Sequence, residues 1–159
     1  KRSIDFMLTQ PGIDPEKIGI VGLSNGGLTS MFAAAYDLRI KLCVASGSLI
    51  MYDRMWHKEL IHCRCQYLYK MQGVLDYYDI FTLIAPRPLV IQNGFKDPIL
   101  PVKSSVQAFE YIKKAYLIDN ATDKVLHDIH DGAHIFRMEI PIGWFNRFLP
   151  LPGQQIPCP

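Results

Sequence analysis

One short motif in the chain has the residue types of a serine nucleophile. Gly22-Leu23-Ser24-Asn25-Gly26 fits the pattern G-x-S-x-G, in which a strand turns abruptly into a helix and leaves the serine hydroxyl exposed. Glycines on either side of the serine remove side chains that would collide in such a turn. Ser24 would then lie at a helix start, where free N–H groups face developing negative charge. The N–H of Asn25 would be one donor of an oxyanion hole.

The flanks of this motif decide between two interpretations. In a chain of this length the pattern arises by chance at roughly the 5% level, and the alternative is a glycine-rich turn with a capping serine. Residues 18–22 are nearly all apolar, which is typical of a strand buried on both faces. Residues 24–36 are small and apolar, which indicates a buried helix. A strand followed directly by a helix favours the nucleophile.

An acid and a base follow in the order that such a serine requires. With this kind of motif the serine is followed in the chain by Asp or Glu and then by His. Asp97 comes just after an apolar stretch at 88–93, and His134 comes just after a weaker strand at 125–130. Loops that follow parallel strands meet at one edge of the sheet. We therefore predict that Ser24 attacks an acyl carbon, His134 takes its proton, and Asp97 orients the imidazole.

Other acids and histidines fit this arrangement less well. Asp97 could itself be an ordinary turn residue, and Asp131 is too close to His134 in the chain to reach behind its ring easily. The remaining candidates lie before the acid-bearing strand, in a long insertion, or within the last strand: Asp76, Asp79, His57, His62, His127 and His130.

The cysteines do not form a recognisable metal motif. Cys63 and Cys65 follow His62, but no second ligand pair accompanies them, whereas zinc sites usually have wider spacing and two pairs. Structural or disulfide roles are favoured for Cys63 and Cys65, and a buried thiol for Cys43. We expect neither a metal nor a cofactor.

The elements that must position these side chains alternate along the chain. We expect helices at 2–10, 24–36, 102–116 and within 135–149, and strands at 18–22, 40–46, 88–93 and 125–130. In the helix at 102–116, Val106, Phe109, Ile112 and Lys113 have amphipathic spacing. Such alternation predicts an α/β fold with a parallel sheet and flanking helices. Residues 1–149 would form one domain, with a cap-like insertion at 47–85 and an extended tail at 150–159.

Composition excludes several classes of protein. The chain of 159 residues is 49% hydrophobic and 20% charged, with a net charge of +2, which is ordinary for a soluble globular domain. This balance gives no electrostatic reason to expect nucleic acid or an anionic membrane as a partner. No apolar run approaches the roughly 18 residues that span a bilayer, and no signal peptide is recognisable. The cellular compartment stays open.

Three segments resemble the acetyl xylan esterase-like and dienelactone hydrolase-like branch of the α/β-hydrolases. They are residues 22–27, residues 84–94 with Lys96-Asp97-Pro98, and residues 131–136; Gly73 and Asp79-Ile80 add to the match. The resemblance covers residues 1 to about 149. It implies hydrolysis of a carboxylic ester, such as an acetyl ester of a carbohydrate, without a cofactor. Prolyl-oligopeptidase-like peptidases share much of the pattern.

The chain departs from this family pattern at its start. Such a domain has several strands before the nucleophile strand, and a loop among them supplies the second oxyanion donor. This chain begins about one helix before the nucleophile strand, so we expect it to lack that loop. We therefore expect a sheet without its N-terminal strands, and an exposed sheet edge open to self-association. Three functions stay open: an ester hydrolase, a serine peptidase, and a non-catalytic remnant that binds a partner.

Overall fold

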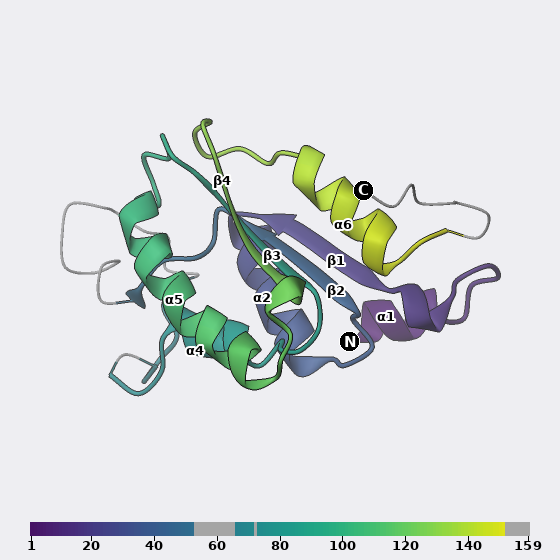
Figure 1. Ribbon diagram of the computed structural model, residues 1–159. Helices are drawn as coiled ribbons and strands as arrows, with labels where there is room; N and C mark the ends of the chain where they lie inside the picture. Colours follow the sequence, from purple (N-terminus) through teal and green to yellow (C-terminus); the bar gives the residue numbers. More distant parts are fainter. Residues whose placement is uncertain (53–65, 72, 152–159) are drawn as a thin grey trace.

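The computed structural model describes residues 1–52, 66–71 and 73–151, and its helices and strands alternate along the chain (Figure 1). They are α1 (Arg2–Met7), β1 (Gly19–Leu23), α2 (Asn25–Tyr36), β2 (Leu42–Ser46), α4 (Tyr77–Thr82), β3 (Leu89–Gly94), α5 (Val102–Ile118), β4 (Val125–His130) and α6 (Glu139–Phe148). The 3₁₀ turns Pro15–Lys17 and Thr122–Lys124 precede β1 and β4. Each predicted strand and helix is present, with bounds that differ by a few residues.

The four strands form one parallel sheet in the order β1-β2-β3-β4. Parallel neighbours need crossover connections, and α2, α4 and α5 lie in these connections. One register row crosses the C-terminal end of the sheet, from Leu23 to Ser46, then to Gln92 and to Asp128. The predicted α/β fold with a parallel sheet is confirmed.

Alternate residues of the central strands enter two different cores. On β2, Cys43 and Ala45 belong to the large core that includes residues of α2, α4 and α5. Leu42 and Val44 belong to the small core beneath α6, because successive side chains of a strand point to opposite faces. Figure 1 shows α6 on one side of the sheet and α4 and α5 on the other. Cys43 is a free, buried thiol, as the sequence predicts.

The buried face of α5 matches the predicted one only in part. Val106, expected on the apolar face, is 42% exposed. Ile112 is buried as predicted and Phe109 packs against the core. The helix also buries Ser104, Ser105, Ala108 and Tyr116, which were not predicted. Small side chains let a helix approach its neighbours closely, and α5 packs against α4 as well as against β3 and β4. Packing against α4, β3 and β4 therefore buries small polar residues beside the apolar ones.

Part of the predicted insertion belongs to the helical layer. Helix α4 lies within residues 47–85, and its Tyr77 and Phe81 are buried in the large core. Residues 53–65 and 72 of that insertion lie outside the described residues, as do residues 152–159 of the predicted tail. Cys63, Cys65, His57 and His62 fall there too, so the interpretations attached to them stay predictions.

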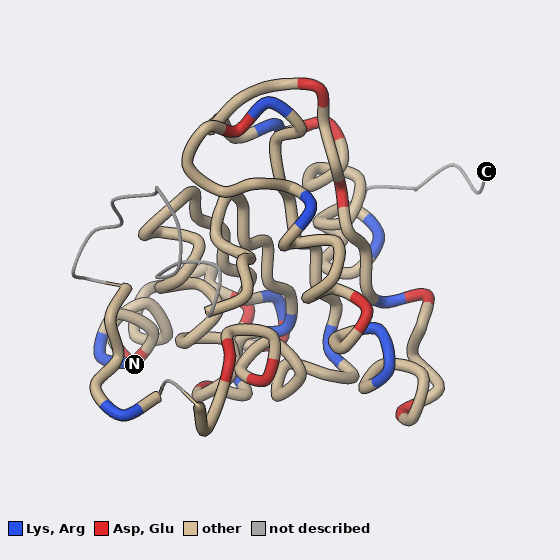
Figure 2. The backbone as a smooth tube through the Cα atoms, turned by 90° about the vertical axis from the view of Figure 1, so that its left-hand side faces the viewer, with Lys and Arg blue, Asp and Glu red and all other residues tan. Residues whose placement is uncertain are grey.

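Strand β1 is an edge of the described sheet. β2 and β3 are buried along their whole length, whereas Val21 at the middle of β1 is 47% exposed. Pairing of this edge with another strand, including a second copy of the chain, stays a prediction. Within the described ranges no helix is long and apolar enough to cross a bilayer. Figure 2 shows basic and acidic positions interspersed along the described backbone.

Candidate active site

Ser24 occupies the sharp turn that the motif predicts. Its backbone has φ 59° and ψ −119°, a region that residues other than glycine seldom adopt and that occurs at functional turns. The turn is anchored because the N–H of Ser24 donates to the carbonyl of Ser46 over 2.8 Å. Ser24 caps α2, so Asn25 is the first helical residue, and N–H groups of the first turn lack partners within a helix.

Two glycines allow the chain to pass through this turn. A methyl group on Gly22 would lie 2.1 Å from the carbonyl oxygen of Gly26, and one on Gly27 would lie 2.5 Å from the carbonyl oxygen of Ser46. These distances are far below van der Waals contact and involve backbone atoms. A methyl group on Gly26 would meet nothing within 4 Å. The turn therefore requires glycine at positions 22 and 27 for steric reasons, but not at Gly26, the last glycine of the pattern.

Asp97 is held with its carboxylate fixed in direction. One oxygen, Oδ1, accepts hydrogen bonds from the backbone N–H groups of Ile99 and Leu100 over 2.8 and 3.1 Å. The other oxygen, Oδ2, lies 2.6 Å from Nδ1 of His134. The Asp97 side chain is only 1% exposed. The turn after β3 thus presents a buried carboxylate whose two oxygens have separate tasks.

His134 is paired with that carboxylate through one ring nitrogen and leaves the other unpartnered. The short contact to Asp97 assigns the proton to Nδ1, because an ionised carboxylate only accepts. Nε2 then carries the lone pair of the neutral imidazole. It is buried and has no hydrogen-bond partner among the described residues, and the side chain is 16% exposed. Such a nitrogen can take up a proton as a general base.

The imidazole lies at the ends of β1 and β2. A methyl group on Gly47, the residue after β2, would be 2.9 Å from Cε1 of His134 and 3.1 Å from Cδ1 of Leu23. Leu23 directly precedes Ser24, so the three candidate residues gather at one edge of the sheet. Asp97 and His134 are in direct contact, whereas the Ser24 hydroxyl makes no hydrogen bond to Nε2. Catalytic hydrogen bonds are often long without substrate.

The rival acids are occupied elsewhere. Asp131 forms an exposed ion pair with Arg137 over 2.7 Å. Asp76 and Asp79 form the capping box at the start of α4. Each of these carboxylates therefore has a local structural partner.

The rival histidines of the last strand also have other partners. His130 accepts a hydrogen bond from the N–H of Gly132 through Nδ1. His127 contacts Asn93 over 3.1 Å, and burial lowers its pKa to about 4. The described part of the chain holds no cluster of three or more His, Cys, Asp or Glu that could bind a metal.

The loops of Asp97 and His134 are fastened to each other, a feature that sequence reasoning missed. The N–H of Phe95 donates to the carbonyl of His130 over 2.7 Å, and the N–H of Lys96 donates to the carbonyl of Gly132 over 3.0 Å. Gly94 permits this contact, since a methyl group there would lie 2.0 Å from the carbonyl oxygen of Ala133. A glycine at the end of an apolar strand was the available signal.

Solved structures with the same fold include carbohydrate esterases. A promiscuous CE15 esterase from a marine bacterial metagenome superposes with a TM-score of 0.77 at 18% identity, over 92% of this chain and 45% of that protein. The glucuronoyl esterase catalytic domain from Hypocrea jecorina superposes with a TM-score of 0.75 at 22% identity, over 97% of this chain and 50% of that one. These likenesses confirm the α/β-hydrolase fold predicted from the motifs.

Sequence comparison leads to the same superfamily. YtaP, a proposed hydrolase of Bacillus subtilis (strain 168), is 27% identical over 124 residues, which are 76% of this chain and 41% of that protein. The thiohydrolase aneE of Aspergillus aculeatus is 44% identical over 48 residues, 30% of this chain and 15% of that protein. The chain thus spans half or less of the length of these relatives. A model of the BAAT / acyl-CoA thioester hydrolase C-terminal family matches residues 1–121, and the chain belongs to that family.

Proposed function

We propose that the chain carries the catalytic residues of a serine hydrolase that cleaves carboxylic esters. The observation that carries this proposal is the Asp97–His134 pair, whose 2.6 Å contact leaves a buried, unpartnered Nε2 at the sheet edge where Ser24 stands. Membership in a family of thioester hydrolases and the fold of known esterases support the same activity.

The proposed reaction has two acyl-transfer steps. His134 Nε2 takes the proton of the Ser24 hydroxyl as its oxygen bonds to the acyl carbon, and the N–H of Asn25 donates to the resulting oxyanion. The C–O bond to the leaving alcohol breaks, and His134 returns the proton to that alkoxide. Water then attacks the acyl-enzyme with the same base, which frees Ser24 and releases a carboxylic acid. Asp97 stabilises the imidazolium in both steps.

Two leaving groups are compatible with this proposal, an alcohol and a thiol. An acetyl ester of a carbohydrate is the substrate that the motif resemblance implies. A thioester is the second candidate, because the family name and the relative aneE both refer to thioester chemistry. The same residues serve both, since a thiolate leaves more readily than an alkoxide and needs less protonation by His134.

Covalent labelling tests the nucleophile before the substrate is known. A fluorophosphonate should modify Ser24 in the wild-type protein and should not modify Ser24→Ala. Ser105→Ala is the matched control, because Ser105 is a buried serine of α5 that hydrogen-bonds within its own helix. A folded protein that resists labelling would be a non-catalytic remnant and would overturn the proposal.

A substrate panel then separates the candidate activities. It contains a short acyl nitrophenyl ester, an acetylated sugar, an acyl-CoA and a peptidyl anilide. We expect ester or thioester hydrolysis that Ser24→Ala abolishes at an unchanged circular dichroism spectrum. Cleavage of the anilide alone would identify a peptidase instead.

A further inference from the structure

Gln92 is a buried polar side chain near the C-terminal end of the sheet, and all four of its hydrogen-bonding positions are used. It lies on β3 and is 0% exposed. Its Oε1 accepts from the Ser46 hydroxyl over 3.0 Å and from the N–H of Arg137 over 2.8 Å. Its Nε2 donates to Asp128 over 2.7 Å and to the carbonyl of Arg137 over 2.9 Å. An amide offers two donors and two acceptor lone pairs, so this one is saturated.

The first set of these bonds leads to Ser24. Ser46 and Gln92 are register partners on β2 and β3. The carbonyl of Ser46 accepts from the N–H of Ser24, so Gln92 holds the strand end on which the serine turn rests. Independently of the side chain, the backbone carbonyl of Gln92 accepts from the N–H of Gly47 over 2.7 Å. Gly47 is the residue against which the His134 ring lies.

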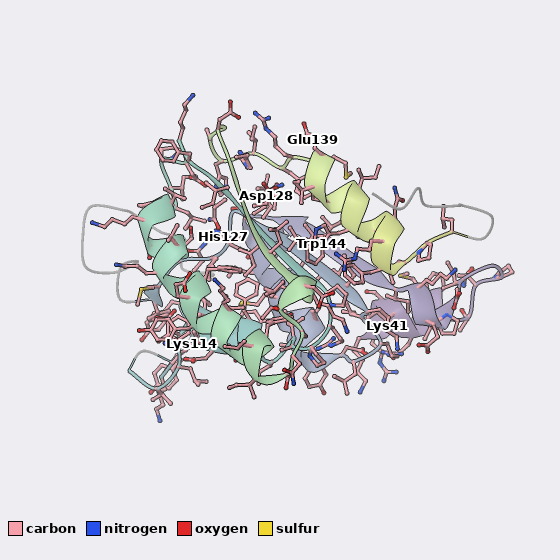
Figure 3. All side chains as sticks on the ribbon, viewed as in Figure 1. Lys41, Lys114, His127, Asp128, Glu139 and Trp144 are labelled. Carbon is pink, nitrogen blue, oxygen red and sulfur yellow. The ribbon has the colours of Figure 1, made fainter. Side chains whose placement is uncertain are left out.

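The hydrogen bonds of the Gln92 amide to Arg137 and Asp128 bear on the position of His134. Arg137 is three residues after His134, between the imidazole and the start of α6. One amide binds both its N–H and its carbonyl, which imitates a pair of sheet hydrogen bonds and fixes that segment on the sheet. Asp128, the register partner of Gln92 on β4, orients the amide; Figure 3 shows Asp128 and His127 on this strand.

We infer that Gln92 is a positioning residue, whose side-chain amide sets the place of the His134 imidazole relative to Ser24 by holding Ser46 and Arg137 at once. The inference rests on the proposed function. No other side chain of similar size reproduces these bonds. A carboxylate at position 92 would accept from Arg137 N–H but would face the Arg137 carbonyl and the Asp128 carboxylate without a donor. A thioether has no donor and accepts only weakly, so the Arg137 carbonyl and the Asp128 carboxylate would lose the bonds that the amide donates.

Steady-state kinetics of Gln92→Met and Gln92→Glu test the inference. We expect kcat to fall roughly 10–100-fold, as for a displaced catalytic group. Because Gln92 is buried away from solvent, we expect KM to stay within about twofold. Tyr116→Phe is the matched control. It removes a buried hydrogen bond to the carbonyl of Arg87, just before β3 and at the opposite end of that strand from Asp97, and should leave kcat unchanged. Equal losses of kcat in both positions would overturn the inference.

An exchanged pair separates positioning from stability. Gln92→Glu combined with Asp128→Asn restores an amide–carboxylate bond between β3 and β4 but gives no donor to the Arg137 carbonyl. We expect Tm to recover and kcat to stay low. Recovery of kcat together with Tm would show that Gln92 only joins the strands and would refute the positioning role.

A spectroscopic readout is independent of the reaction. The Nδ1 proton of His134, held in the short contact with Asp97, should give a sharp downfield proton resonance in the wild type and in Tyr116→Phe. It should broaden in the Gln92 variants as the segment loosens and water gains access. If Ser24 resists labelling, the proposed function fails. The Nδ1 proton resonance of His134 still tests whether Gln92 positions the imidazole. An unchanged resonance in Gln92→Met would overturn the inference.

Discussion

The contact between Gly94 and the loop of His134 makes a single methyl group a strong perturbation. In Gly94→Ala the new Cβ would lie 2.0 Å from the carbonyl oxygen of Ala133, 2.6 Å from that of Gly132 and 2.8 Å from the carbonyl carbon of Ala133. All three are backbone atoms, so no side chain can rotate away. Non-bonded carbon atoms meet at about 3.5–4.0 Å. Even a close contact of about 3 Å requires the end of β3 and the loop after β4 to separate by about 1 Å.

That separation acts on the residue after Ala133, which is His134. A misplacement of about 1 Å can reduce turnover about 100-fold, and forced overpacking costs about 1–3 kcal/mol of stability. We expect kcat for ester hydrolysis to fall by about that factor in Gly94→Ala. Thermal unfolding followed by circular dichroism measures the stability loss separately.

A matched substitution controls for the change of residue type. Gly143→Ala adds a methyl group at an exposed position of α6 where nothing lies within 4 Å, and should raise stability by about 0.5–1 kcal/mol at unchanged kcat. If Gly94→Ala keeps wild-type kcat, the idea that this backbone contact sets the imidazole position is refuted.

Two further substitutions test the electrostatics. Asp97→Asn removes the charge behind His134 and allows the wrong ring tautomer, so kcat should fall roughly 10⁴-fold with little change in KM; a loss of less than tenfold would contradict the role of Asp97. Burial lowers the pKa of His127 to about 4 from its ordinary value near 6.5. The unfolded chain therefore binds a proton that the folded chain refuses as pH falls from about 6.5 to 4, and stability declines there by up to about 3 kcal/mol. In His127→Gln, denaturant titrations across this range should show a shallower decline, and an equal decline in both proteins would refute this assignment.

Local chemistry determined most of the fold. The alternation of apolar runs with small-residue and amphipathic segments predicted all four strands and helices α1, α2, α5 and α6, but not α4, because strands buried in a parallel sheet read as near-continuous apolar runs. The contact face of α5 was predicted only in part. Val106 fits the apolar period but is exposed, since the face that a helix buries depends on its neighbours α4, β3 and β4, and these are set by the tertiary structure.

The sequence by itself also determined the order and types of the candidate catalytic residues. A serine in a strand-to-helix motif, an aspartate after a later strand and a histidine after the last one follow from how parallel strands share one edge. Only the tertiary structure decided that Asp97 meets His134 while Asp131 pairs with Arg137.

The hydrogen bonds that hold the candidate catalytic residues in place could not be predicted from the sequence either. Gln92 is one of two polar residues, with Asn93, at the end of an apolar strand, and nothing in its neighbours along the chain shows that it binds Ser46, Asp128 and Arg137. These residues are separated by tens of positions and become adjacent only when the strands pair. Hydrogen bonds depend on distances of a few tenths of an ångström, and such distances are a property of the folded sheet rather than of the order of its residues.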